Sequence, residues 1–398
     1  MYDAIVVGAR CAGSPTAMLL ARKGHRVLLV DRAGFPSDTL STHYIHQSGI
    51  ARLDRWGVLP RIVAAGAAGV RNYTLDLGPF ALRGAPPPIG AITDGYSLRR
   101  TILDQILVEE AALAGVVVRQ QFPVEGLVKE GDRVTGVHSR GRTEHARIVI
   151  GADGMNSLVA RLAGAPRYDD QGTLTCAYYT YWSGVDIDGV ELYPRDGQMI
   201  LAWPTNGDQI VTIVFWPNQE FHAVRADVER HFMAAIERAA SGLAGRLRAG
   251  TRTERFRGSA RLANFYRRPH GDGWALVGDA GYHKDPILAL GIGDAFRDAE
   301  LLAEAVDDGL WGRAPMDRAL ADYERRRNEA SAAGFQSTLD FARLQAPDPM
   351  MQQLFMALRD RPEDRDRLFG TFAGSVAPEE FFSPDNLARI LAPLPKAA

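Results

Sequence analysis

The chain has 398 residues, with 46 Lys and Arg against 48 Asp and Glu, a net charge of −2, and two cysteines. This length predicts two or three domains, and a balanced charge without a basic stretch argues against nucleic-acid binding. Two cysteines cannot form a disulfide framework, which fits a reducing compartment. The first expected strand starts at Asp3, which leaves no room for a signal peptide, and no apolar run reaches the ~18 residues of a membrane span. We therefore expect a cytoplasmic protein without an integral membrane segment.

The N-terminal segment, residues 3–31, has the pattern strand, glycine turn, helix, strand. Apolar runs at 4–7 and 27–30 are the expected strands, and a helical pattern covers 12–22. Strands that helices cover on both faces have continuous apolar runs rather than alternating ones. This segment therefore predicts the first unit of a parallel α/β sheet.

Later segments extend this α/β pattern. Helical patterns cover 44–56 and 98–114, short strands are expected over 127–150, and another apolar run occupies 274–277. A long charged helix is expected over 316–344, followed by short helices broken by proline.

The chain changes character after about residue 170. From 173 to 216 it is rich in β-branched and aromatic residues, and helical periodicity returns over 224–247. Three dipeptides in this region each predict a hairpin turn: Asp188-Gly189, Asp196-Gly197 and Asn206-Gly207. We therefore expect an antiparallel sheet inserted between parts of the α/β domain.

The first motif is the loop GARCAG at 8–13, between the first strand and the first helix. A dinucleotide-binding loop carries Gly at its first, third and sixth positions. Arg10 holds the third position here, and a ligand-free turn is the alternative interpretation. Asp31 follows Gly8 by 23 residues, where a carboxylate can accept hydrogen bonds from ribose hydroxyls. The helix N-terminus offers N–H groups to a pyrophosphate, and Arg10 can add a positive charge there.

Two further glycine motifs follow expected strands. GADG at 151–154 precedes a helix and is equally consistent with a plain turn, since Asp and Gly both form turns. Gly278-Asp279 follows the run 274–277, and Gly291-Ile292-Gly293 stands at the start of another helix. Glycines at a helix start let the backbone approach a flat ligand, and the helix dipole favours negative charge there. Two nucleotide-binding elements so far apart suggest one long dinucleotide, FAD.

Together these motifs resemble the FAD-dependent aromatic hydroxylase superfamily, the group A flavoprotein monooxygenases with a p-hydroxybenzoate hydroxylase-like fold. Geranylgeranyl reductases and flavin halogenases are its more distant relatives. The resemblance covers roughly 3–55, 96–165 and 270–330. Its last motif is matched in register by Gly278, Asp279, Pro286, Gly291, Asp298 and Ala299, with Ala289 in place of one glycine.

This resemblance implies an α/β fold: a Rossmann-like FAD-binding domain with an inserted antiparallel-sheet substrate domain and a helical C-terminal region. The FAD-binding domain is expected at 1–75, 96–170 and 266–330, the substrate domain at 76–95 and 171–265, and the C-terminal region at 331–398.

The motifs and the resemblance also give a set of expected FAD-binding residues. Arg100 would approach the pyrophosphate, with Arg99 as a competing candidate, and Asp153 has a structural role as its alternative. Cys11 is expected to act as a small packing residue within its loop. The full set is Gly8, Arg10, Cys11, Ala12, Gly13, Asp31, Arg32, Arg100, Val124, Asp153, Asp279, Pro286, Gly291 and Ile292.

Three residues are candidates for proton transfer near the flavin. His43 ends the loop 35–43, which the family directs toward the flavin ring, and Tyr282 and His283 follow the Gly-Asp motif. A His or Tyr at such a place can act as an acid or a base, with a structural hydrogen bond as the alternative. His43 and His46 alone are too few ligands for a metal, so no metal site is predicted.

The implied function is a monooxygenase that uses NAD(P)H and O2 to oxygenate an aromatic or polyketide-like small molecule through a flavin C4a-hydroperoxide. Aromatic side chains in 178–216 suit an apolar pocket for a flat substrate. The main alternative is a reductase or dehydrogenase that acts on carbon–carbon bonds. A halogenase is weaker because the Trp-x-Trp-x-Ile-Pro segment is absent, and a non-catalytic flavin protein is a further alternative. The sequence leaves the substrate, the choice of NADH or NADPH, and the oligomeric state open.

Overall fold

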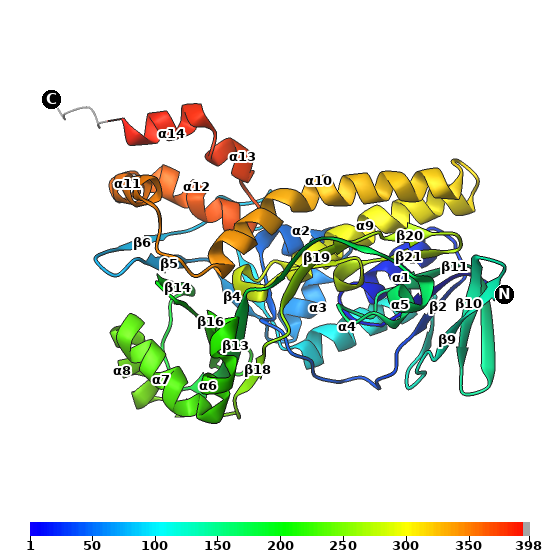
Figure 1. Ribbon diagram of the computed structural model, residues 1–398, viewed down its shortest axis with the longest axis horizontal. Coiled ribbons are helices and arrows are strands. Elements are labelled where there is room, and N and C mark those ends of the chain that lie inside the picture. The colour runs from blue at the N-terminus through cyan, green and yellow to red at the C-terminus, as the bar shows by residue number, and fades with distance from the viewer. Residues whose placement is uncertain (393–398) are drawn as a thin grey trace.

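The computed structural model describes residues 1–392 and has a mixed α/β fold (Figure 1). Its first large sheet has the order β20-β21-β11-β1-β2-β8, and the β9–β10 hairpin joins it through β11. Strands β8, β2, β1, β11 and β21 run parallel. The strands are β1 (Tyr2–Val7), β2 (Val27–Val30), β8 (Val117–Arg119), β9 (Gly126–Glu130), β10 (Arg133–Ser139), β11 (Arg142–Gly151), β20 (His270–Gly271) and β21 (Trp274–Leu276).

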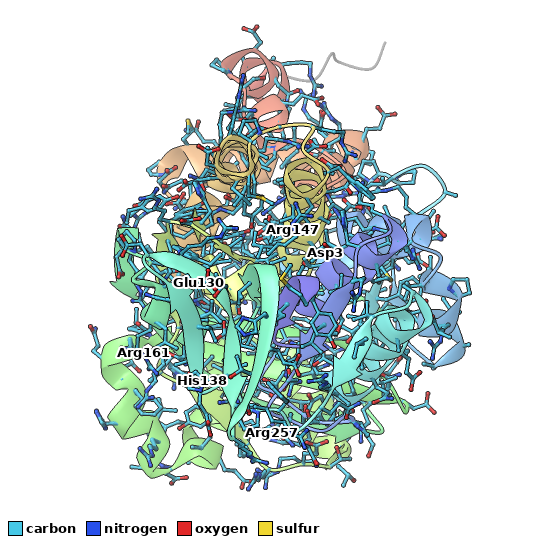
Figure 2. All side chains as sticks on the ribbon, turned by 90° about the vertical axis from the view of Figure 1, so that its right-hand side faces the viewer. Asp3, Glu130, His138, Arg147, Arg161 and Arg257 are labelled. Carbon is cyan, nitrogen blue, oxygen red and sulfur yellow. The ribbon has the colours of Figure 1, made fainter. Side chains whose placement is uncertain are left out.

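Strand β1 is apolar at consecutive positions because each face of this sheet is covered. Ala4 and Val6 pack in the cluster under α1 (Gly13–Arg22), α4 (Arg100–Leu113) and α9 (Gly291–Leu310). Ile5 and Val7 pack on the other face with α5 (Leu158–Ala163) and the β9–β10 hairpin. Figure 2 views this hairpin, with Asp3 and Arg147 close together where β1 begins beside the middle of β11. The expectation of a parallel sheet covered on both sides is confirmed.

The second large sheet has the order β17-β13-β16-β15-β14-β5-β6, with β18 paired to β13. Alternation along β13 divides its aromatic side chains between two clusters. Tyr179 and Tyr181 lie on the face toward the first sheet, and Tyr178 and Trp182 pack under α7 and α8. The elements are β5 (Tyr73–Asp76), β6 (Ala81–Gly84), β13 (Thr175–Ser183), β14 (Val190–Arg195), β15 (Gln198–Thr205), β16 (Gln209–Pro217), β17 (Thr251–Arg252), β18 (Arg257–Ser259), α6 (Phe221–Ala226), α7 (Val228–Ala239) and α8 (Ser241–Ala249).

One of the three expected hairpin turns is wrong. Asp196-Gly197 and Asn206-Gly207 join β14 to β15 and β15 to β16, which are antiparallel neighbours. Strand β13 instead pairs with β16, and β14 pairs in parallel with β5. Gly189, at φ +90°, passes so close to the earlier strand that a Cβ would lie 2.0 Å from the carbonyl oxygen of Asn72. The glycine therefore serves a close crossing of two backbones.

The C-terminal half adds helices above both sheets. The long α10 (Met316–Ala342) packs beside α9 (Figure 1) and runs through residue 330, where a domain boundary was expected. Four shorter helices follow, and their apolar residues complete the cluster on the inner face of the second sheet. They are α11 (Pro349–Leu358), α12 (Pro362–Ala373), α13 (Pro378–Phe381) and α14 (Pro384–Leu391). Of the helices described, none is long and apolar enough to cross a membrane.

Small elements connect the two large sheets. They are the three-stranded sheets β3-β7-β4 and β12-β19-β22, with two helices and three 3₁₀ turns. Their bounds are β3 (Tyr44–Ile45), β4 (Ala68–Val70), β7 (Gly95–Ser97), β12 (Arg167–Thr173), β19 (Ala263–Arg267), β22 (Tyr282–His283), α2 (Gln47–Arg55), α3 (Leu59–Ala64), η1 (Asn218–Glu220), η2 (Gly278–Ala280) and η3 (Pro286–Leu288).

Candidate functional site

A cavity of about 680 Å³ extends from the carboxyl ends of β1 and β2 to the inner face of the second sheet. Its nucleotide end is formed by the loop after β1 and by segments 30–33, 122–124 and 152–156. Its other end is formed by side chains of β13 and β16, among them Tyr179, Ile213 and Phe215. Ligands of open parallel sheets bind at this edge, because the loops that follow the strands converge there.

The loop after β1 has the geometry of an anion site. A Cβ on Gly8, at φ +106°, would lie 2.4 Å from the Ala152 oxygen, and a Cβ on Gly13 would lie 1.7 Å from the Gly8 oxygen. Both positions therefore require glycine. At the third position, the Arg10 side chain donates to Ser37 and to the buried Asp104. Helix α1 has no side-chain cap, and within residues 1–392 the N–H groups of 10–13 have no protein acceptor. Free N–H groups at a helix start bind phosphate oxygens.

Asp31 is buried at the end of β2 and lines the same cavity. The N–H of Ala9 donates to its Oδ2, and the N–H of Ala33 donates to its Oδ1, both at 2.7 Å. These two bonds fix the carboxylate, and each oxygen keeps a lone pair for a further donor. The exposed Arg32 and the half-buried Val124 also line this end of the cavity.

Two arginines converge on Asp104, beside the pyrophosphate loop. Arg10 donates to Oδ2 of Asp104 at 2.5 Å, Arg100 donates to both oxygens at 3.0 and 3.1 Å, and the Cys11 thiol donates to Oδ1 at 3.4 Å. Burial acts to lower the pKa of Arg100, but its surroundings, with Asp104 foremost and Asp279 also contributing, outweigh burial, so the pKa is raised. Burial raises the pKa of Cys11, so this residue is an unreactive thiol. Arg99 instead turns to Tyr181 and Glu254.

The carboxylate of Asp153 is occupied by hydrogen bonds from neighbouring residues of the protein. It accepts bonds from the Ser157 hydroxyl at 2.5 Å and from the N–H groups of Leu158 and Val159 at 2.7 and 3.2 Å. Burial raises its pKa, and these bonds act against that shift. Asp153 therefore holds the start of α5 while lining the cavity.

The second nucleotide element lies opposite the first. Asp279 is exposed into the cavity, and its carboxylate has no hydrogen-bond partner among the described residues. Pro286, Gly291 and Ile292 also line the cavity, and Ala289 turns the chain between them with a φ of +54°. Helix α9 has no side-chain cap, and the N–H groups of 291–293 find no acceptor within residues 1–392. Two uncapped helix starts thus face one cavity.

The three proton-transfer candidates lie in different surroundings. His43 is buried against Tyr181, with ring centroids 5.7 Å apart, and does not line the cavity. Burial lowers the pKa of His43 to about 3, so it is uncharged at neutral pH. Tyr282 also lies outside the lining, where it accepts a bond from Arg297 at 2.7 Å and stacks on Tyr266. Burial raises its pKa well above the usual value, which leaves this hydroxyl a structural role.

His283 is the candidate that lines the cavity. Its Nδ1 lies 2.5 Å from the carbonyl oxygen of Ala263. A carbonyl oxygen only accepts hydrogen bonds, so Nδ1 carries the proton, and in the neutral ring Nε2 keeps its lone pair. Nε2 has no partner within the described chain.

Sequence reasoning missed the tethers between the cavity loops and the second sheet. Asp38 of the cavity loop pairs with Arg257 of β18, and Glu254 joins Arg257 to Arg99 at 3.5 and 2.7 Å. Thr175 of β13 donates to Asp285 at 2.5 Å. Apart from Glu254 and Arg257, which are three residues apart, these partners are far apart along the chain, and no spacing in the sequence links them.

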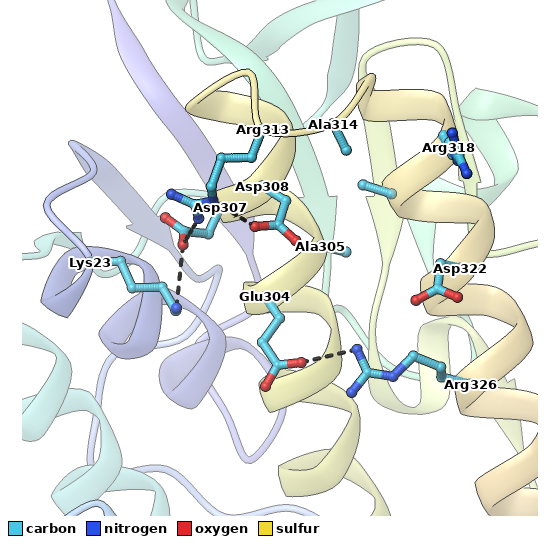
Figure 3. A pocket seen from close by; sticks show the side chains of 11 residues that line it. Lys23, Glu304, Ala305, Asp307, Asp308, Arg313, Ala314, Arg318, Asp322 and Arg326 are labelled. Carbon is cyan, nitrogen blue, oxygen red and sulfur yellow. Dashed lines mark hydrogen bonds and ion pairs between the residues drawn. The ribbon is translucent and has the colours of Figure 1, made fainter.

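A second depression, of about 370 Å³, lies between α9 and α10 (Figure 3). Most of its charged side chains neutralise one another: Lys23 and Arg313 pair with Asp307, and Glu304 pairs with Arg326. It shares no lining residue with the large cavity and offers no unpaired cluster for a ligand. In the described part of the chain, no group of three His, Cys, Asp or Glu side chains could hold a metal ion.

The paired helix starts, the fixed Asp31 and the free Asp279 fit a long dinucleotide with a negatively charged centre. They define an α/β dinucleotide-binding protein whose ligand reaches a second, aromatic sheet. The chain belongs to the family described as FAD binding domain, which matches residues 1–338. FAD is therefore its cofactor, and the resemblance stated from the motifs is confirmed.

Comparisons with known proteins agree with this family. The chain is 30% identical over 356 residues to 6-methylpretetramide 4-monooxygenase of Streptomyces rimosus, covering 83% of this chain and 81% of that one. It is 27% identical over 364 residues to digeranylgeranylglycerophospholipid reductase 1 of Methanopyrus kandleri, covering 86% and 89%. The relatives thus include both a monooxygenase and a reductase.

Solved structures share the fold at lower identity. A flavoprotein/dehydrogenase from Cytophaga hutchinsonii has a TM-score of 0.82 at 18% identity, covering 98% of each chain. PqsL, a probable FAD-dependent monooxygenase from Pseudomonas aeruginosa, has a TM-score of 0.73 at 22%, covering 93% of this chain and 99% of that one. The brominase Bmp2 has 0.77 at 18%, covering 98% and 93%.

Proposed function

We propose that this protein is a monooxygenase that uses FAD, NAD(P)H and O2 to oxygenate an aromatic or polyketide-like small molecule. The observation that carries the proposal is the continuity of the cavity from the pyrophosphate loop to Tyr179, Ile213 and Phe215. A flavin whose dinucleotide part occupies the first end reaches these side chains with its ring. The monooxygenase from Streptomyces rimosus supports this choice, since it is 30% identical over most of both chains.

The chain's own residues have separate parts in binding. The N–H groups of 10–13 bind the pyrophosphate, Asp31 accepts bonds from a ribose hydroxyl, and Asp279 accepts them from the ribityl chain. The N–H groups of Gly291 and Ile292 hold the pyrimidine edge, where the α9 dipole stabilises negative charge. Bound FAD would supply the transfer of electrons from NAD(P)H to O2, with one oxygen atom entering the product and the other leaving as water.

We assign proton transfer to His283. The other charged side chains on the substrate side are neutralised, because Asp38 pairs with Arg257 and Lys284 pairs with Asp294. The Nε2 lone pair of His283 can take the proton of a phenolic or enolic hydroxyl, which makes the neighbouring ring carbon more electron-rich. The proton returns when the oxygenated ring regains its hydroxyl.

The test uses the purified holoenzyme with NADH or NADPH, ¹⁸O₂ and a panel of phenols and polycyclic polyketides. We expect at least one compound of the panel to accelerate flavin reduction or oxygen uptake, and its product to contain one ¹⁸O atom. A product in which a carbon–carbon double bond is reduced and no ¹⁸O is gained would overturn the proposal. It would favour the reductase alternative, which the Methanopyrus kandleri relative represents. The cytoplasmic location stays a prediction, and the comparison of NADH with NADPH in this assay decides the nicotinamide preference.

The role of His283 has its own test. His283→Gln should lower kcat for oxygenation at least tenfold, while FAD affinity stays unchanged. It should also remove the pH dependence of kcat/KM that proton transfer by His283 causes. His138→Gln is the matched control, since His138 is exposed on β10 (Figure 2) and outside the cavity. An unchanged pH profile in His283→Gln would remove the assignment.

A further inference from the structure

A buried hydrogen-bond chain, whose members do not line the cavity, reaches the turn before α9. The hydroxyls of Tyr44 and Tyr73 lie 2.9 Å apart, Tyr73 lies 3.2 Å from Nδ1 of His46, and Nε2 of His46 lies 3.0 Å from the carbonyl oxygen of Leu288. All three side chains are at most 7% exposed. Sequence reasoning considered His46 only as a metal ligand, a role for which it has no companions.

The proton positions along this chain have one solution. The Leu288 carbonyl can only accept, so Nε2 of His46 carries a proton. Burial lowers the pKa of His46 to about 4, so the ring is neutral and Nδ1 accepts from the Tyr73 hydroxyl. The Tyr73 oxygen in turn accepts from Tyr44. Every member of the chain therefore has a partner, and removing one leaves a buried polar group unpaired.

The carbonyl that His46 holds lies at a strained turn. Ala289, the next residue, has a φ of +54° without being glycine, a conformation that costs about 1 kcal/mol or more. This turn directs Gly291 and Ile292 to the cavity as the uncapped start of α9. A strained turn persists only where its surroundings hold it, and the bond from His46 is a contact that holds this one.

The same hydrogen-bond chain reaches the second sheet and the C-terminal helices. Tyr73 belongs to β5 and lies 5.6 Å from the Phe369 ring of α12, measured between centroids. Tyr44 lies 5.6 Å from the ring of Trp203 in β15. The turn beside the cavity is thus tied to the layer that forms the substrate side.

We propose that His46 is a positioning residue, which through the chain Tyr44–Tyr73–His46 fixes the Leu288–Ala289 turn and so presents the N–H groups of Gly291 and Ile292 to the flavin. The inference rests on the proposed place of the flavin edge but not on the reaction, because it concerns binding and local order. Failure of the oxygenation test would leave it standing.

The test compares His46→Leu with His46→Gln. Leucine removes the donor and the acceptor, whereas a glutamine amide can still donate to the Leu288 carbonyl and its oxygen can accept from Tyr73. For His46→Leu we expect amide hydrogen exchange in 289–294 of the holoenzyme to rise about tenfold, and FAD to bind about tenfold more weakly, the loss of one buried bond. His46→Gln should stay within about threefold of the wild type in both measurements.

Exchange by mass spectrometry and flavin fluorescence titration give these values without any turnover. His46→Leu that folds with unchanged exchange in 289–294 and unchanged FAD affinity would overturn the proposal. If His46→Leu does not fold, Tyr73→Phe decides, because it removes one hydroxyl and leaves the ring packing intact. Increased exchange in 289–294 of Tyr73→Phe supports the proposal, and unchanged exchange overturns it.

Discussion

The buried carboxyl of Asp285 gives a prediction that depends on pH. Asp285 is 2% exposed, accepts from the Thr175 hydroxyl at 2.5 Å and from the Ile287 N–H at 3.1 Å. Burial raises its pKa from 3.8 to about 6, against the opposing effect of these bonds. The folded state therefore prefers the protonated carboxyl, and this group's contribution to stability is complete below pH 4 and lost as the pH rises through 6.

The shift of about two pKa units corresponds to about 3 kcal/mol of stability. About half of this is already lost at pH 5, and nearly all of it at pH 7. Asp285→Asn keeps the shape of the side chain, can accept from Ile287 and donate to Thr175, and carries no charge at either pH. Its stability relative to the wild type should therefore rise by about 1–1.5 kcal/mol between pH 5 and pH 7.

Thermal unfolding of both proteins, followed by tryptophan fluorescence with FAD bound, measures this difference. At about 2.1 cal/mol/K for each residue, the expected gain in relative Tm is about 2 °C. Asp285→Ala is the control, because it also carries no titrating group but loses both hydrogen bonds. It should be less stable than Asp285→Asn at both pH values and show the same rise relative to the wild type between pH 5 and pH 7. If the Tm difference between Asp285→Asn and the wild type is equal at both pH values, the raised pKa of Asp285 is refuted.

Three further predictions concern the cavity and its surroundings. Asp279→Ala should weaken FAD binding about tenfold by fluorescence titration, since a charged hydrogen-bond acceptor is lost; unchanged affinity would contradict its assignment. Asp104→Asn should destabilise the protein by about 3–5 kcal/mol in urea unfolding, because Arg10 and Arg100 lose their buried counter-charge, and a change below 1 kcal/mol would argue against that pairing. Tyr282→Phe should lower stability by about 1 kcal/mol and keep kcat within about twofold; a large fall in kcat would restore a catalytic role.

The sequence was sufficient where function depends on local backbone geometry. Gly13 is required by its contact with the Gly8 oxygen within one turn, and Gly8 has a φ of +106° that favours glycine. Asp31 follows its strand directly, so their pattern predicts the nucleotide loop. Arg10 weakened the pattern in the sequence, but the structure accommodates its side chain through bonds to Ser37 and Asp104. Hairpin prediction was correct at Asp196-Gly197, where the turn depends on local backbone geometry. It failed at Asp188-Gly189, where the glycine is required by close contact with a strand that is distant in sequence.

The sequence by itself determined the FAD-binding class, the two nucleotide elements and the antiparallel character of the inserted sheet, because each depends on a motif of residues close together in the sequence. Tertiary structure decided which candidate side chains reach the cavity. Tyr282 and His283 are neighbours in one strand, and the period of two sends the first into the core and the second to the cavity. It also decided the contact of His46 with Leu288, 242 residues later. Such contacts depend on how separate elements pack, and no local pattern records them.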